Sequence, residues 1–151
     1  MKVVIQRSLK SKVKVDGKTI GKIDKGFTLL VSFTLSDDDK VIDYMIKKIV
    51  NLRIFDDEYG IMNKSIMDIK GEILSISQFT LYADTSKGNR PNYVKALNSK
   101  KAVKLYDLFN EKLSRYVPVQ TGKFGANMIL EITNDGPVTI CLEREVEHDK
   151  K

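Results

Sequence analysis

The stretch from Phe27 to Val50, FTLLVSFTLSDDDKVIDYMIKKIV, decides the fold class. Its first part, Phe27 to Phe33, is a nearly continuous apolar run, as expected of a β-strand that is buried on both faces. Ser36 then has the character of a helix N-cap, because aspartates follow it and apolar residues recur at helical spacing from Val41 onward. A buried strand that leads into an amphipathic helix predicts a sheet with helices packed against it.

Further strands and one more helix are predicted on either side of this stretch. Before it, apolar and polar residues alternate in Val3–Ile5 and Val13–Val15, and the turn signal Asp16-Gly17 leads into a strand at Thr19–Ile23. After it, the predicted elements are strands at Leu52–Phe55, Glu72–Leu81, Ala126–Thr133 and Val138–Glu145, a loop over residues 82–98 and an amphipathic helix from Ser99 to Tyr116. We therefore predict an α+β fold, with a mostly antiparallel sheet and two amphipathic helices.

Length and composition favour a single globular domain over residues 1–151. Apolar residues make up 42% of the 151 residues, which is too many for a disordered chain. The longest uncharged stretches, Gly26 to Ser36 and Ile73 to Ala83, span about 11 residues, whereas a membrane span needs about 20. The start of the chain has no signal-peptide pattern, and Cys141 is the one cysteine. We expect a cytoplasmic protein without a disulfide and without a membrane partner.

The net charge of +6 is concentrated in one segment, residues 85–123. That segment holds nine lysines and arginines against two acidic residues, Asp107 and Glu111, so its net charge is +7. Its cations are Lys87, Arg90, Lys95, Lys100, Lys101, Lys104, Lys112, Arg115 and Lys123. Such an excess attracts a polyanion such as RNA, although a solvated helix face explains the same charges.

Most of the common catalytic devices are missing from the sequence. The one histidine, His148, lies in a charged tail, so a nucleophile activated by histidine is excluded from the body of the chain. One cysteine and one histidine cannot supply a zinc site, and no phosphate-binding or dinucleotide-binding glycine motif is present. The acidic runs Asp37-Asp38-Asp39 and Asp56-Asp57-Glu58 are better explained as a helix start and a turn. We expect no cofactor and no metal.

Three segments carry unusual chemistry for their surroundings. Ser77, Gln78 and Thr80 interrupt an apolar strand, where their hydroxyl and amide groups need hydrogen-bond partners. Gly122-Lys123-Phe124-Gly125-Ala126 places two glycines around an aromatic residue, where backbone can approach a flat ring closely. Asn134-Asp135-Gly136-Pro137 has the composition of a hairpin turn between the last two strands. Each of these signals is weak when taken alone.

Together, in this order and spacing, these segments resemble the D-aminoacyl-tRNA deacylase family, known also as the D-Tyr-tRNA deacylases. The resemblance covers nearly the whole chain. The combination of Ser-Gln-Phe-Thr-Leu with Asn-x-Gly-Pro-Val-Thr makes it specific. The segments that carry it are Val4-Ile5-Gln6-Arg7, Asn51-Leu52-Arg53-Ile54-Phe55, Leu74 to Asp84 (LSISQFTLYAD), Lys87-Gly88-Asn89-Arg90-Pro91, Thr121 to Met128 (TGKFGANM) and Asn134 to Thr139 (NDGPVT).

The resemblance implies a compact, barrel-like α+β fold that acts as a homodimer. In that family's arrangement the Gly136-Pro137 peptide is cis and enters the partner's pocket, where its carbonyls accept hydrogen bonds from an α-ammonium group. Arg7 would brace this segment. The resemblance places the following residues around the receiving pocket: Ser77, Gln78, Phe79 and Thr80 in its lining, Phe124, Gly125, Ala126 and Met128 beside a terminal adenosine, and Ala102 facing that adenosine from the second helix.

The implied reaction is hydrolysis of the ester that joins a D-amino acid to the 3′-terminal adenosine of tRNA. L-aminoacyl-tRNA would be excluded, Gly-tRNA hydrolysed to some extent, and DNA not bound. Because Thr80 has no histidine or evident lysine base, we favour attack by water with help from the ribose 2′-hydroxyl. Backbone N–H groups near Phe79 and Thr80 would stabilise the oxyanion, so that Thr80 positions the substrate and does not attack it.

Two other classes of function stay open at this stage. A non-catalytic RNA-binding module would use the basic segment and would need aromatic side chains exposed on strands. The aromatic residues of this chain mostly occupy core-like positions, which counts against that class. A threonine-dependent esterase of small molecules would instead be active without tRNA.

Overall fold

Strand β4 (Gly26–Ser32) lies at the centre of a five-stranded sheet in the computed structural model, which describes residues 1–146. The strand order is β10-β1-β4-β7-β8, and the other four strands are β1 (Lys2–Ser8), β7 (Glu72–Ser77), β8 (Val119–Thr121) and β10 (Asn134–Glu143). The pairs β10-β1 and β1-β4 are antiparallel, whereas β4-β7 and β7-β8 are parallel. Because neighbours flank β4 on both edges and nearly all of its residues are buried, the prediction of a strand buried on both faces is confirmed.

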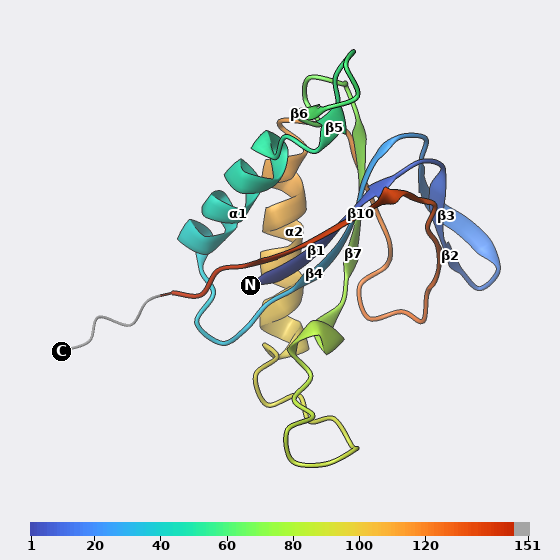
Figure 1. The fold of residues 1–151 in the computed structure, drawn as a ribbon. Helices are drawn as coiled ribbons and strands as arrows, with labels where there is room; N and C mark the ends of the chain where they lie inside the picture. The colour runs from blue at the N-terminus through green and yellow to red at the C-terminus, as the bar shows by residue number, and fades with distance from the viewer. Residues whose placement is uncertain (147–151) are drawn as a thin grey trace.

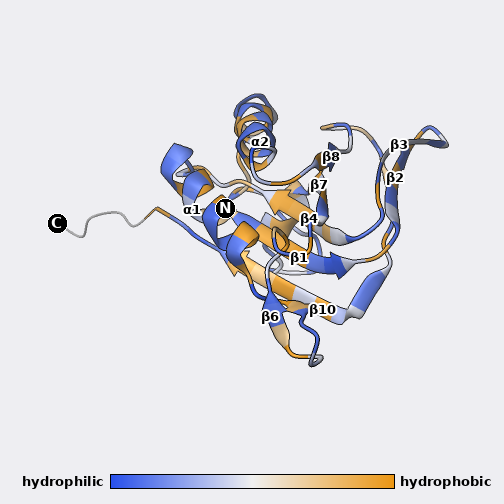
Figure 2. Ribbon diagram, turned by 90° about the horizontal axis from the view of Figure 1, so that it is seen from above, coloured by the Kyte–Doolittle hydropathy of each residue, from blue (hydrophilic) through white to orange (hydrophobic). Residues whose placement is uncertain are grey.

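Both helices lie on one side of this sheet, α1 (Asp39–Asn51) beside α2 (Ser99–Leu113) (Figure 1). Helix α1 buries the apolar stripe that the spacing predicts, namely Val41, Ile42, Met45, Ile46, Ile49 and Val50. Leu29 and Val31 of β4 and Phe109 of α2 belong to the same core. In Figure 2, apolar colour runs along the central strands β4 and β7, whereas both helices carry apolar and polar residues in turn.

A second, three-stranded sheet lies on the side of β7 away from the helices (Figure 1). It has the order β3-β2-β9, with β2 (Ser11–Val15), β3 (Lys18–Ile23) and β9 (Ile129–Glu131) all antiparallel. A small second core, Val13, Ile23, Leu74 and Ile76, joins the two sheets. A two-stranded sheet of β5 (Phe55–Asp56) and β6 (Met62–Lys64) completes the strands of the described residues.

The predicted α+β class, with two α-helices and mostly antiparallel pairing, is therefore confirmed for residues 1–146. The barrel-like closure is wrong, since β10 and β8 remain open edges of the five-stranded sheet. Two short strands, β6 and β8, were not predicted. Neither α-helix among the described residues has the length and apolar character that a bilayer span requires.

Several predicted boundaries differ from those of the structure. Asp38 and not Ser36 is the N-cap of α1, because its carboxylate accepts from the Val41 amide at 3.1 Å. The second helix ends at Leu113 and not at Tyr116. The strand predicted at 52–55 is reduced to the pair Phe55–Asp56, and the strand predicted at 72–81 ends at Ser77, where a 3-10 turn, η1 (Phe79–Tyr82), follows.

The last two strands do not form the hairpin that the sequence suggested. Strand β9 pairs with β2 in the small sheet, whereas β10 pairs with β1 in the large one. Asn134 to Pro137, predicted as the hairpin turn, is the first part of β10 itself. The chain thus crosses from one sheet to the other at residues 132–133, a step that turn composition alone does not reveal.

Candidate active site

A pocket with a volume of about 510 Å³ opens where the two sheets and the start of α2 meet. It is formed by the ends of β4 and β7, by η1, by the first turn of α2 and by the segment that leads into β9. Its lining residues are Val31, Ser32, Phe33, Ile76, Ser77, Gln78, Phe79, Leu97, Ser99, Ala102, Phe124, Gly125, Ala126, Asn127, Met128 and Leu130. This volume is in the range of small-molecule sites, and a nucleoside is a ligand of that size.

None of the described residues that line the pocket has an ionisable side chain. The polar side chains in the lining are hydroxyls and amides, those of Ser32, Ser77, Gln78, Ser99 and Asn127. Such a site recognises a ligand by shape, stacking and neutral hydrogen bonds. It supplies neither a general base nor a set of metal-ligating carboxylates or imidazoles from its own walls.

The turn η1 presents free backbone donors beside the pocket. The chain leaves β7 at Ser77, and the Gln78 amide still donates to the Val31 carbonyl at 2.7 Å. The next two N–H groups, of Phe79 and Thr80, have no backbone acceptor among residues 1–146, as expected at the start of a helical turn. Two adjacent free N–H groups are a suitable device for binding an oxyanion.

The side chains of η1 point into different surroundings. Phe79 is 56% exposed, and its ring meets that of Tyr93 edge-on, with a centroid distance of 5.0 Å. Thr80 is exposed and is absent from the pocket lining. The Gln78 side-chain amide donates to the Thr80 hydroxyl, which ties these two side chains to each other. Among residues 1–146, the Thr80 hydroxyl has the Gln78 amide as its hydrogen-bond partner and no base.

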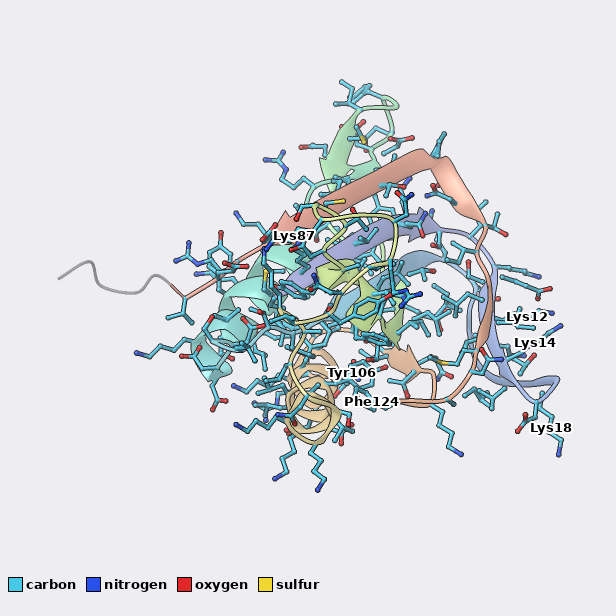
Figure 3. All side chains as sticks on the ribbon, turned by 90° about the horizontal axis from the view of Figure 1, so that it is seen from below. Lys12, Lys14, Lys18, Lys87, Tyr106 and Phe124 are labelled. Carbon is cyan, nitrogen blue, oxygen red and sulfur yellow. The ribbon has the colours of Figure 1, made fainter. Side chains whose placement is uncertain are left out.

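The buried Tyr106 supports the pocket residue Phe124 from behind. The Tyr106 ring tilts against that of Phe124, with centroids 5.8 Å apart, and both are labelled in Figure 3. The Tyr106 hydroxyl donates to the Ser75 carbonyl at 2.7 Å. Burial raises the pKa of Tyr106, so this hydroxyl stays protonated and keeps donating at physiological pH. The Phe124 ring therefore packs against a tyrosine whose position is fixed by its hydrogen bond to Ser75.

Gly136 and Pro137 form a separate exposed feature at the start of β10. Both are exposed, the peptide between them is cis, and neither lines the pocket of its own chain. Asn134 holds this segment in shape, because its side-chain amide donates to the carbonyls of Arg7 and Val138, both at 3.0 Å. We call this exposed, hydrogen-bonded segment the Gly136-Pro137 projection.

Arg7 supports the same projection from below. Its guanidinium is buried and donates to the Ile54 carbonyl at 2.9 Å and to the Asp135 carbonyl at 3.3 Å. It also lies 3.2 Å from a carboxylate oxygen of Asp135 and 3.5 Å from one of Asp56. One planar group thereby links β1, the segment before β5 and the start of β10, a use that suits arginine and not lysine.

The structure thus divides the site residues predicted from the sequence into two groups. One group lines the pocket: Ser77, Gln78, Phe79, Ala102, Phe124, Gly125, Ala126 and Met128. The other group lies outside the pocket of its own chain: Thr80, Arg7, Gly136 and Pro137. Sequence reasoning did not find Leu97, Ser99 and Asn127 in the lining, because only the approach of α2 to β9 brings them together.

Comparison with known proteins agrees with this geometry. The family model for D-Tyr-tRNA(Tyr) deacylase matches residues 4–143. The chain belongs to this family. As a D-Tyr-tRNA deacylase family member, it is a hydrolase that acts on the ester bond of D-aminoacyl-tRNA, and its substrate is therefore a tRNA.

Two solved structures are similar to this deacylase over almost its whole length. A c-Myc DNA unwinding element binding protein is 43% identical, covers 97% of this chain and 100% of its own, and superposes with a TM-score of 0.92. A probable eukaryotic D-amino acid tRNA deacylase is 16% identical, covers 93% of this chain and 97% of its own, and superposes with a TM-score of 0.81. At 16% identity the second likeness concerns the fold.

Proposed function

We propose that this deacylase proofreads the chirality of aminoacyl-tRNA as a homodimer, with each pocket completed by the partner's Gly136-Pro137 segment. The observation that carries the proposal is the separation of two features in one chain. The pocket is open and its described lining has no charged group, and the exposed Gly136-Pro137 projection does not contribute to that lining. A second copy related by two-fold symmetry can bring each projection to the other pocket, because such an interface uses the same surfaces twice.

The pocket would bind the 3′-terminal adenosine. Phe124 offers a ring against which a base can stack, and Ala102 in the same lining leaves room for the ligand because its side chain is one methyl group. Gly125 has φ of +76°, a conformation that favours glycine, so the backbone beside Phe124 can turn sharply around the ligand. The neutral lining suits a nucleoside, whose charge lies on its phosphate and not on its base or ribose.

The chemistry would rest on backbone and substrate groups. The free N–H groups of Phe79 and Thr80 would stabilise the oxyanion that forms when water attacks the ester carbon. Each such donor contributes about 3–4 kcal/mol to lowering the barrier in other hydrolases. Since the lining has no base, the ribose 2′-hydroxyl of the substrate would assist the water, and Thr80 would position the ester through its contact with Gln78.

Chiral selection would follow from a steric contact with backbone. The carbonyls of Gly136 and Pro137 from the partner would accept the α-ammonium group, which fixes two substituents of the α-carbon. A D side chain would then point to solvent, whereas an L side chain would collide with the Gly136-Pro137 backbone. Because glycine lacks a side chain, the same site would admit Gly-tRNA.

The experiment that tests the proposal follows release of the amino acid from five substrates: D-Tyr-, L-Tyr-, D-Ala-, L-Ala- and Gly-tRNA. We expect rapid hydrolysis of both D substrates, measurable hydrolysis of Gly-tRNA and none of either L substrate. Equal hydrolysis of L-Ala-tRNA and D-Ala-tRNA would contradict the steric filter. Complete inertness toward Gly-tRNA at high enzyme concentration would mean that a positive contact with the side chain is required.

Binding of DNA is a second candidate, supported by the name of the 43% identical relative and by the net charge of +6. That name describes binding by the relative and gives no residue for it. A neutral pocket has no evident use in binding a duplex, which favours the deacylase activity as the function of this site. Competition of duplex DNA against tRNA at physiological salt measures the balance directly.

A further inference from the structure

The hairpin of β2 and β3 carries a row of lysines that the pocket does not use. Val13 points inward to the small core, so its neighbours Lys12 and Lys14 point outward. Lys22 is the cross-strand partner of Lys12 and therefore lies on the same outer face. Lys18 begins β3 at the hairpin tip, and Figure 3 shows Lys12, Lys14 and Lys18 on one side of the molecule. We call Lys12, Lys14, Lys18 and Lys22 the hairpin lysines.

The charges of this face are not balanced within the protein. Like charges directly opposite each other on adjacent strands destabilise a sheet, and Lys12 faces Lys22 in this way. Glu131 on β9 lies 3.2 Å from the Lys12 ammonium and 3.8 Å from that of Lys14. Its hydrogen bond with Lys12 lowers the pKa of Glu131, so this carboxylate is ionised throughout the physiological range. Within residues 1–146, Lys18 and Lys22 have no acidic partner.

The hairpin lysines lie on the outer face of the small sheet, and the inner face of the same sheet lines the pocket. Leu130 of β9 lines the pocket from the inner face of the small sheet, and Met128 lines it from the segment just before β9. The hairpin lysines occupy the outer face of the same sheet. The pocket and the hairpin lysines thus lie on opposite faces of one sheet. A nucleic acid strand that leaves the pocket and passes over the edge of this sheet therefore reaches the lysines after crossing the thickness of a single sheet.

We propose that the hairpin lysines hold the phosphates of the tRNA acceptor stem while the single-stranded 3′ end bends into the pocket. This inference rests on the proposed function of the pocket. Lysine is a point charge on a flexible stem, which suits a regular row of phosphates and not the edges of particular bases. No aromatic residue stands among the hairpin lysines for stacking unpaired bases, so the face matches a duplex backbone and not a single strand.

The test compares two double variants that each lose two unpaired lysines. Lys18→Ala with Lys22→Ala removes charge from the hairpin and breaks no ion pair. Lys40→Ala with Lys47→Ala removes the same charge from the exposed face of α1, on the other side of the large sheet (Figure 1). Binding of uncharged tRNA is titrated at several salt concentrations. Hydrolysis is followed on D-Tyr-tRNA and on the D-tyrosyl ester of adenosine, which has no stem.

We expect the hairpin variant to bind tRNA about tenfold more weakly at low salt. The plot of log affinity against log salt should become less steep, with the magnitude of its negative slope reduced by about 2. Hydrolysis of D-tyrosyl-adenosine should stay within about twofold, since neither lysine touches the pocket. The melting temperature should hold or rise, because Lys22→Ala removes the repulsion with Lys12. The α1 variant should match the unmodified protein in every measurement.

An unchanged affinity and an unchanged salt slope in the hairpin variant would overturn the inference. So would a variant that keeps its tRNA affinity but loses binding to vesicles of anionic lipid, a partner that the exposed Ile20 and Ile129 beside the lysines could also suit. The proposed function fails separately, namely if the unmodified protein does not hydrolyse D-tyrosyl-adenosine or D-Tyr-tRNA. The binding titration uses uncharged tRNA and does not depend on that result.

Discussion

At the scale of single residues, the chemistry proposed for this deacylase rests on groups that are rarely counted as catalytic. The free N–H groups of Phe79 and Thr80 exist because β7 ends at Ser77 and η1 begins two residues later. Arg7 matters for its shape, since one planar group reaches the carbonyls of Ile54 and Asp135 at once. Substitutions at this scale separate a side chain that reacts from one that positions.

Thr80→Val should keep the rate of D-Tyr-tRNA hydrolysis within about tenfold of the unmodified protein, because the hydroxyl is proposed to position and not to attack. Loss of a nucleophile would instead lower the rate by roughly 10⁴-fold or more. Single-turnover hydrolysis measures the difference. The matched experiment uses unmodified protein and a substrate ending in 2′-deoxyadenosine, which should react far more slowly. A dead Thr80→Val variant with a native circular dichroism spectrum, together with rapid hydrolysis of the deoxy substrate, would reverse the assignment.

Arg7→Lys should lower kcat/KM by about 10- to 100-fold, because an ammonium cannot bridge Ile54 and Asp135 in the fixed geometry of the guanidinium. The loss should exceed what the change in melting temperature explains, since the affected feature is the placement of Gly136 and Pro137. Arg53→Lys is the matched control, because Arg53 also donates to a carbonyl, that of Asn63 at 2.9 Å, but has no hydrogen bond to the segment of residues 134–137. Equal effects of the two substitutions on activity would remove the special role of Arg7.

At the scale of elements, two features of the chain position the site. The basic segment 85–123 does not offer all of its cations to a ligand, because two of them near the end of α2 are paired within the protein. Lys112 lies 2.8 Å from Asp43, and Arg115 lies 2.8 Å from Glu111. The register of the parallel pair β4-β7 places Ser77 opposite Val31, so that η1 begins beside the end of β4.

The triple variant Lys87→Ala, Arg90→Ala, Lys100→Ala should weaken tRNA binding and lower the salt slope by about 3, if each cation contacts one phosphate. All three side chains are exposed, so the fold should be unaffected. The control is Lys112→Ala with Arg115→Ala, from the same segment but with both charges already paired. An unchanged salt slope in the triple variant would mean that these three cations do not contact tRNA phosphates and are only solvated surface charges.

Gly26→Ala should destabilise the protein by more than about 3 kcal/mol, because a Cβ at this position would lie 1.8 Å from the Glu72 carbonyl oxygen in the β4-β7 pair. Gly17→Ala is the control. Its φ of +75° is also unfavourable for alanine, but no atom lies within 4 Å, so the cost should be about 1 kcal/mol. Urea denaturation of both variants measures the two costs. Similar midpoints would show that β4 and β7 can separate without loss of the fold.

At the scale of the whole molecule, the proposal makes the active unit a pair of chains. Within one chain the pocket and the Gly136-Pro137 projection do not meet. Two defects, one in each feature, should therefore complement each other across subunits. This behaviour distinguishes a shared site from two independent sites on one dimer.

Gly136→Val should abolish the projection, because even its Cβ would lie 3.0 Å from the Arg7 guanidinium, and Ala126→Trp should fill the pocket. Each variant alone should be inactive. After unfolding and refolding as an equal mixture, activity should return to about a quarter of the unmodified level, since half of the dimers are mixed and each mixed dimer has one complete site. Refolded single variants are the control for the procedure. A mixture as inactive as its components would contradict a pocket shared between subunits.

Much of the architecture can be predicted from local sequence patterns, because buried strands and helices need apolar residues at regular spacing. Phe27 to Phe33 predicts the central strand because apolar side chains on both faces have no other stable location, and the stripe of α1 follows from helical spacing. The exact ends were less predictable. Ser36 and Asp38 are both competent caps by composition, and only the path of the chain after β4 chooses between them.

The sequence by itself determined the α+β class, the two amphipathic helices, the lack of histidine in the body of the chain and, through its motifs, half of the residues that line the pocket. Only the tertiary structure decided that Asn134 to Pro137 begins a strand and is not a hairpin turn, that β7 ends before Phe79, and that Gly136 lies away from its own pocket. The physical reason is the range of the interactions. Periodicity and capping act between residues a few positions apart. The places of β9 and β10 depend on pairing with β2 and β1, more than a hundred residues away in the chain, and the end of β7 depends on pairing with β4, in which Ser77 lies opposite Val31.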